Sequence, residues 1–315
     1  MGQCQSTPPS GNERPETLEI KIIEESSNPN APSSPNDGDG VDCPSGINPT
    51  PEFISIVIFP QVLKNYAHLG EAANAKMDYS SALHYFYLAR DGFEEIHGVK
   101  SHGGDNSIEV VELEFLIASA KDELGRCDEA LTLYREVLKK QEKVFGLEDE
   151  RTLTTLNNTG WSLYENKLYE ESKEHYEKCL ERKINVFGEN HAKSITTMNS
   201  LGDLYLDGFK DYPLAIKYKV MALEARKKVL GEKHPDTLST IMNIAIITSC
   251  GTSDMKKARE LFKRALVGYE GQLGKAHRMT KDCAGNYKVF LREHPKEKGA
   301  AKELKKLERE YPDAS

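Results

Sequence analysis

The chain has 315 residues, with 42 basic and 50 acidic side chains and a formal net charge of −8. Residues 1–52 hold nine acids and two bases, so they carry −7 and the remainder only −1. An acidic chain without a basic domain argues against nucleic acid as the main ligand. The longest predominantly apolar run covers residues 53–59, whereas a membrane-spanning helix takes about 20 residues.

The N-terminus reads Met-Gly-Gln-Cys-Gln-Ser, which fits the pattern M-G-x-x-x-[ST] for myristoylation of Gly2. One myristoyl chain gives marginal membrane affinity, so stable anchoring needs a second signal. The acidic segment that follows provides no polybasic patch, and Cys4 is therefore the candidate for a second, palmitoyl anchor. A chance match of Gly2 and Ser6 is the alternative interpretation.

Residues 1–52 also contain nine of the fourteen prolines and are too polar to bury a core. They are predicted to form a disordered, acidic Pro/Ser-rich tail. Apolar residues alternate in residues 17–23, which could be a strand or a docking motif, although a solvated linker is the simpler interpretation. The chain has no secretory signal, so we expect it in the cytoplasm, peripheral on the cytosolic face of a membrane.

The body repeats itself. Its glycines at 146, 188, 231 and 274 are spaced by 42, 43 and 43 residues. Small residues recur in phase at 70, 118, 160, 202 and 245, and again at 82, 130, 172, 215 and 258. Each unit reads as two helices that cross closely at the small residues. The first is predicted to begin at an N-cap (Thr152, Ser194 or Thr237). The second is predicted to end at a glycine with positive φ.

These marks resemble a tetratricopeptide-repeat protein of the 42-residue kinesin light chain/nephrocystin-like type. The matching motifs are Gly-x-x-His-Pro-x-Thr at 231–237, Asn-Asn at 157–158, Leu-Gly at 69–70 and 201–202, and Tyr-x-x-Ala at 79–82. The resemblance covers about residues 60–294. It implies an all-α fold, a right-handed α-solenoid of helix-turn-helix repeats. Residues 53–295 would hold about five repeats and a half-repeat, and residues 296–315 a capping helix and tail.

In this family the first helices line a concave groove that holds a peptide or a partner helix. Carrying the pattern over by position gives six candidate groove residues: Asn157, Asn158, Trp161, Asn199, Asp203 and Asn243. Asparagine amides both donate and accept, so a row of them can hold an extended backbone. Trp161 could anchor an apolar side chain, or it could simply pack between repeats.

The sequence offers no comparable sign of catalysis. His191, His234 and His277 recur once per repeat at the same junction. Stacked repeats would hold them about 10 Å apart, too far for one ion, so we interpret them as turn residues. The six cysteines are scattered without a CxxC pair, and no phosphate loop or nucleophile elbow appears. We therefore expect no metal, no cofactor and no enzyme activity.

The leading hypothesis is a non-catalytic scaffold that binds partner proteins in its groove and is tethered to a membrane through Gly2 and Cys4. One alternative is a soluble cargo adaptor similar to kinesin light chains. The long coiled coil that precedes the repeats in those proteins has no counterpart here, which weakens any assignment as a motor subunit. A regulatory subunit of an enzyme complex is the second alternative, with serines of the tail as phosphorylation sites.

Overall fold

The computed structural model describes residues 59–96 and 107–312. Within these ranges the chain forms two compact units: an N-terminal unit that ends at Gly146, and a C-terminal unit that begins at Leu147. The described residues are helical and include no strand. This confirms the predicted all-α fold built from helix pairs, while the predicted disordered tail (1–52) lies outside the described residues.

The N-terminal unit contains two helix pairs. Its elements are α2 (Phe59–Ala75), α3 (Tyr79–Ile96), α4 (Ile108–Glu123) and α5 (Cys127–Val144). Aromatic side chains from three helices fill its core, with Phe86, Phe115 and Tyr134 almost fully buried. The rings of Phe115 and Tyr134 lie 6.0 Å apart.

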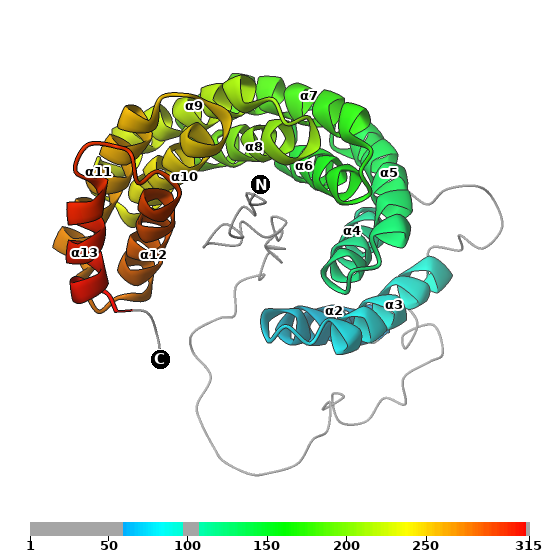
Figure 1. Ribbon diagram of the computed structural model, residues 1–315. Coiled ribbons are helices and arrows are strands. Elements are labelled where there is room, and N and C mark those ends of the chain that lie inside the picture. Colours follow the sequence, from blue (N-terminus) through cyan, green and yellow to red (C-terminus); the bar gives the residue numbers. More distant parts are fainter. Residues whose placement is uncertain (1–58, 97–106, 313–315) are drawn as a thin grey trace, which may run out of the picture. The chain divides into compact units, whose positions relative to one another are not determined.

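The C-terminal unit continues the same arrangement with three helix pairs and two final helices. Its elements are α6 (Glu150–Glu165), α7 (Tyr169–Phe187), α8 (Ala192–Asp203), the π-helical turn η3 (Leu204–Gly208), α9 (Tyr212–Leu230), α10 (Pro235–Gly251), α11 (Met255–Leu273), α12 (Arg278–Glu293) and α13 (Ala300–Glu310). Within this unit α6, α8 and α10 lie on the inner side of the row, and α7 and α9 lie on the outer side (Figure 1).

Small residues mark the helix crossings, as the sequence predicted. A β-carbon added at Gly160 would lie 2.9 Å from the ring of Tyr176, and one added at Gly70 would lie 2.5 Å from Phe86. The hydroxyl of Ser172 donates to the carbonyl of Gly160 at 2.7 Å, which fixes α7 against α6. A larger residue at either glycine would force the paired helices apart.

The junctions between repeats correct one prediction. The first helices are capped by Asp149, His191 and His234, and not by Thr152, Ser194 and Thr237. The ring Nδ1 of His234 accepts the backbone N–H of Asp236 at 3.2 Å. The hydroxyl of Thr237 instead donates to the carbonyl of Gly231 at 2.9 Å. An imidazole nitrogen and a carboxylate oxygen can each accept a backbone N–H at a helix N-terminus. The N-cap therefore lies three residues before the Ser or Thr that the sequence predicted as the cap.

The glycines at the ends of the second helices adopt the predicted positive φ. Gly188 has φ 91° and Gly231 has φ 88°. A left-handed residue also occurs in the turn within the described helix pairs, except for α10–α11. Gly125 has φ 73° there, but the equivalent residues in other pairs are Met77 and Lys167, each with φ 62°. A residue with a β-carbon is strained in this region.

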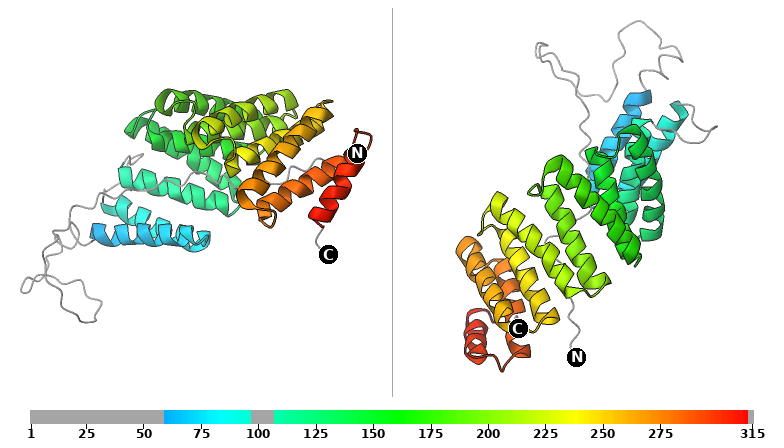
Figure 2. Two further views of the ribbon diagram at one scale, coloured as in Figure 1. Left: turned by 90° about the vertical axis from the view of Figure 1, so that its left-hand side faces the viewer. Right: turned by 90° about the horizontal axis from the view of Figure 1, so that it is seen from above.

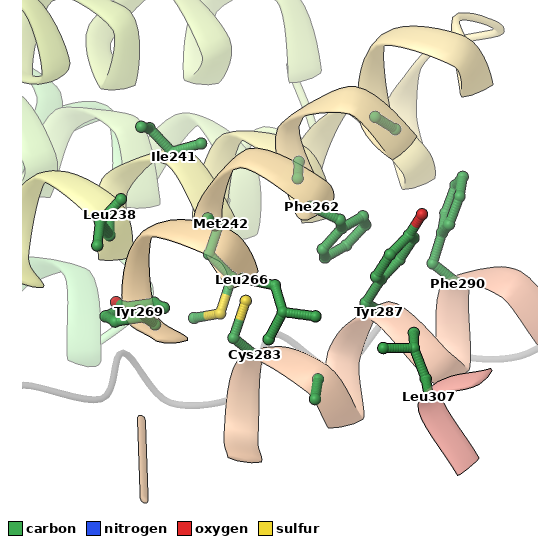
Figure 3. Packing of buried hydrophobic residues seen from close by; sticks show 14 of the residues in the cluster. Leu238, Ile241, Met242, Phe262, Leu266, Tyr269, Cys283, Tyr287, Phe290 and Leu307 are labelled. Carbon is green, nitrogen blue, oxygen red and sulfur yellow. The ribbon is translucent and has the colours of Figure 1, made fainter. Parts of the chain in front are cut away.

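The last two helices close the C-terminal unit. Leu307 is buried in a cluster with Phe262, Tyr287 and Phe290 (Figure 3). Tyr311 belongs to the same cluster. The ammonium of Lys288 donates to the carbonyl of Tyr311 at 2.7 Å. Figure 2 shows α13 at the end of the row of helices in this unit. Helix α13 lies within the segment 296–311 that the sequence predicted as a capping helix.

Candidate functional site: the first-helix face of the C-terminal unit

The six predicted groove residues all belong to α6, α8 and α10 of the C-terminal unit, but their side chains differ in accessibility. Asn157 is buried and joins three helices. Its Oδ1 accepts from the hydroxyl of Thr197 on α8 at 2.8 Å and from the ammonium of Lys183 on α7 at 3.4 Å. These bonds commit much of its polar capacity to holding the repeats together.

Asn158 and Asn199 lie deeper than the resemblance suggested. Asn158 is fully buried, and neither its Oδ1 nor its Nδ2 has a hydrogen-bond partner among the described residues. Asn199 is 7% exposed, and its Nδ2 is likewise without a partner there. A buried polar group left unpaired costs about 1–3 kcal/mol. Both side-chain amides, on the first helices α6 and α8, therefore retain unused hydrogen-bonding capacity.

Trp161, Asp203 and Asn243 are half-buried, so part of each side chain reaches the surface. Trp161, Asp203 and Ile246 follow the small residues Gly160, Gly202 and Ala245 by one position, so the repeat places them equivalently. Ile246 packs against the core cluster that extends to α13. We define the first-helix face as the half-buried residues Trp161, Tyr164, Asp203, Asn243 and Ile246.

A row of aromatic rings extends from Trp161 toward η3. Successive ring centroids lie 5.5–6.2 Å apart, within the range of favourable aromatic contacts. The row is Trp161, Tyr164, Tyr169, Phe209, Tyr205 and Tyr218. Because these rings support one another, the exposed part of Trp161 is held on a rigid base.

Asp203 is held by a buried lysine. The ammonium of Lys219, on α9, lies 2.8 Å from the Asp203 carboxylate, and the Lys219 side chain is 3% exposed. Its aliphatic part lies over Gly202, where an added β-carbon would be 2.9 Å away. The residues facing Gly70 and Gly160 in the same way are aromatic, Phe86 and Tyr176. In the α8–α9 pair a lysine therefore occupies the position that an aromatic ring holds in the α2–α3 and α6–α7 pairs, and its ammonium contacts Asp203.

The aspartates at this end of the face each lie near a lysine ammonium: Asp203 is 2.8 Å from Lys219, and Asp207, within η3, is 3.7 Å from Lys210. Burial raises the pKa of Asp207, and that of Glu165 as well. The hydroxyl of Tyr164 donates to the Asp207 carboxylate at 3.5 Å. Burial, together with the nearby Asp207, raises the pKa of the Tyr164 hydroxyl far above its ordinary value. The Tyr164 hydroxyl is thus a hydrogen-bond donor throughout the physiological range.

Sequence reasoning missed Lys219, Asp207 and the turn η3. The two small residues of a pair are 12 residues apart at 160 and 172, but 13 apart both at 202 and 215 and at 245 and 258. Of these two longer pairs, only the one at 202 and 215 contains the π-helical turn η3, whereas α10 and α11 are regular helices. The longer spacing therefore does not by itself predict the turn. Such turns often occur at functional sites.

The junction histidines have a structural role. His191, His234 and His277 each accept a backbone N–H through Nδ1 at the start of a first helix. Across residues 59–96 and 107–312, no group of three or more metal-ligating side chains is found. No helix in those ranges is long and apolar enough to cross a bilayer. The predicted acylation sites, Gly2 and Cys4, lie outside the described residues.

Comparison with known families identifies the repeats. The tetratricopeptide-repeat family matches residues 117–150 and 162–218. No curated protein matches the sequence.

Several solved structures share the fold. BtubC (BKLC) from P. vanneervenii is 22% identical, with 69% of this chain and 83% of that chain covered and a TM-score of 0.58. A putative kinesin light chain repeat protein from Podosopora anserina is 16% identical, with 67% and 96% covered and a TM-score of 0.58. A Rap protein solved in complex with competence and sporulation factor is 14% identical, with 82% and 78% covered and a TM-score of 0.52. The family matches and these folds agree with the predicted tetratricopeptide repeats, and the kinesin light chain type stays a prediction.

Proposed function

We propose that this tetratricopeptide-repeat protein is a non-catalytic scaffold that holds an extended segment of a partner protein on the first-helix face of its C-terminal unit. The proposal is based mainly on Trp161 and Asp203, which occupy equivalent positions on successive first helices. One side chain is aromatic and the other is acidic, and both are partly exposed. In a purely structural repeat these positions need no such chemistry. The peptide complex of the Rap protein, a neighbour in fold, supports a peptide as the kind of partner.

In this proposal the six predicted residues have different roles. Trp161 supplies an apolar contact that the aromatic row keeps rigid. Asn243 offers an amide to the partner's backbone, and Asn158 and Asn199 have unused amide capacity behind the surface. Asp203, whose charge is paired with Lys219, offers its partly exposed carboxylate to an N–H of the partner at the η3 end. Asn157 acts indirectly, because its bonds to Thr197 and Lys183 position α6 against α8.

A double substitution at the accessible positions tests the proposal. Partners captured by the full chain are compared by quantitative mass spectrometry with those captured by Trp161→Ala/Asn243→Ala. Val267→Ala is the control, because Val267 is 65% exposed on the second helix α11. A set of partners lost with the double variant and kept with the control is expected, and a peptide from one of them should bind the purified chain directly. Identical partner sets for all three proteins would reject the proposal.

We also propose that the scaffold is tethered to the cytosolic face of a membrane by myristate on Gly2 and palmitate on Cys4. The M-G-x-x-x-[ST] pattern and the spacing of the two acceptors support the tether. Labelling cells with an alkyne analogue of myristate should mark the wild-type chain and leave Gly2→Ala unmarked. A thioester-linked label that hydroxylamine removes should depend on Cys4. An unlabelled wild-type chain would favour a soluble adaptor instead.

A further inference from the structure

The apolar, acidic and basic side chains of the final helix, α13, lie on different sides of the helix. Ala300 and Leu307 are buried, and Leu304 packs against the same core. This apolar stripe fixes which side of α13 faces the rest of the C-terminal unit. The opposite side, by geometry, faces solvent.

The acidic side chains of α13 form ion pairs with basic residues of neighbouring segments. Glu303 accepts from the guanidinium of Arg259 at 2.9 Å and from the ammonium of Lys263 at 2.6 Å, both on α11. Further ion pairs join Glu310 to Lys275 at 2.7 Å and Glu308 to Arg292 at 3.0 Å. The negative charges of the helix are therefore neutralised within the fold.

The basic side chains gather on the solvent side. They are Lys302, Lys305, Lys306 and Arg309, which follow the i, i+3, i+4, i+7 spacing and cover roughly 100° of the helix. All four are exposed. Lys302, Lys305 and Arg309 form no ion pair with any described residue, and Lys306 only approaches Glu310 at 3.8 Å. We call these four residues the α13 basic ridge. The exposed Lys296 and Lys298 precede it in the chain.

We propose that the α13 basic ridge contacts the anionic lipid headgroups of the membrane to which the chain is tethered. The ridge stands on the outside of a helix, and its long side chains can each reach a separate headgroup. Such an arrangement suits a diffuse layer of negative charge. The inference rests on the proposed tether in one respect: acyl chains on Gly2 and Cys4 would hold the chain at the membrane, where the ridge adds an electrostatic contact. The acidic segment next to Gly2 offers no such basic contact, whereas the folded C-terminal unit does.

Vesicle cosedimentation of the unacylated full chain tests the ridge separately from the tether. The protein is produced in a host that lacks N-myristoyltransferase and mixed with phosphatidylcholine vesicles with or without phosphatidylserine. Wild type should bind only the vesicles that contain phosphatidylserine, and added salt should weaken binding. The triple variant Lys302→Gln/Lys305→Gln/Arg309→Gln should partition about 100-fold less, at about fivefold for each lost base.

The control has the same net charge with the substitutions elsewhere: Lys178→Gln/Lys233→Gln/Lys256→Gln, at three exposed lysines of the C-terminal unit. It should bind as wild type does, and circular dichroism melts should show all three proteins equally folded. An equal loss in both variants would reduce the effect to net charge and overturn the proposal. The proposal would also be overturned if wild type bound equally to vesicles with and without phosphatidylserine. The same holds if the ridge variant lost binding to an acidic polypeptide but kept its binding to vesicles. Failure of the tether shows separately, as a missing myristate label on Gly2.

Discussion

The pairing of Lys219 with Asp203 gives the sharpest test of the packing described above. Replacing Asp203 with Asn keeps the shape of the side chain and removes its charge. The ammonium of Lys219, which lies 2.8 Å from the carboxylate and belongs to a side chain only 3% exposed, would then lose its charged partner. Removing one member of a buried pair costs about 3–5 kcal/mol. Because the Asp203 side chain is 37% exposed, water offsets part of this, and we expect about 2 kcal/mol.

A double-mutant cycle isolates the pair. Lys219→Met keeps most of the aliphatic contact with Gly202 and removes the charge, so by itself it should cost less than about 1.5 kcal/mol. Asp203→Asn should then have almost no effect in the Lys219→Met background, and the coupling free energy should be about 2 kcal/mol. Urea unfolding followed by the fluorescence of Trp161, the chain's only tryptophan, reports on the C-terminal unit. If Asp203→Asn costs the same in both backgrounds, the cation is not held by this carboxylate and the reasoning fails.

Three further substitutions test local features of the fold. Lys167→Gly should raise the free energy of unfolding by about 0.5–1 kcal/mol, because it relieves a positive φ of 62°; a lower melting temperature would contradict this. His234→Ala should cost about 1 kcal/mol by removing the N-cap of α10, while His234→Asp should restore it; equal losses would show that the ring acts otherwise. Glu303→Gln tests pH dependence. Burial alone would raise the pKa of Glu303, but hydrogen bonds from Arg259, Lys263 and Tyr287 lower it to about 2. A depressed folded pKa stabilises above the unfolded value of about 4.3 and stops doing so as pH falls through the folded value. Thermal melts should therefore show a deficit of about 1–2 kcal/mol for the variant at pH 7, discounted for solvent exposure, that vanishes near pH 2; a deficit independent of pH would rule out the charge.

Local sequence was sufficient to predict the repeat, its helix ends and its helix crossings. The glycines at 188 and 231 and the small residues at 160 and 172 predicted the helix ends and helix crossings that the structure contains. These features depend on backbone conformation or on the lack of a side chain, and both follow from residue identity alone. The histidine caps were missed for the opposite reason. An imidazole nitrogen is a less common acceptor at a helix start than a hydroxyl oxygen. The hydroxyl of Thr237 fits the usual capping pattern, but it donates to the carbonyl of Gly231 instead.

The state of the candidate site depended on the tertiary structure. Asn157 and Asn158 are neighbours of the same type, yet one bonds to Thr197 and Lys183, and the other is buried with no described partner. No sequence pattern distinguishes them, because the difference lies in what α7 and α8 bring to each side chain. Lys219 likewise reads as an ordinary exposed lysine of an amphipathic helix. It becomes a buried cation because α9 packs against α8, so that its side chain lies over Gly202 and its ammonium meets Asp203. The sequence by itself determined the periodicity and the helix ends, since these are local. The accessibility, pairing and charge of the side chains on the first-helix face were decided by packing between helices distant in the chain.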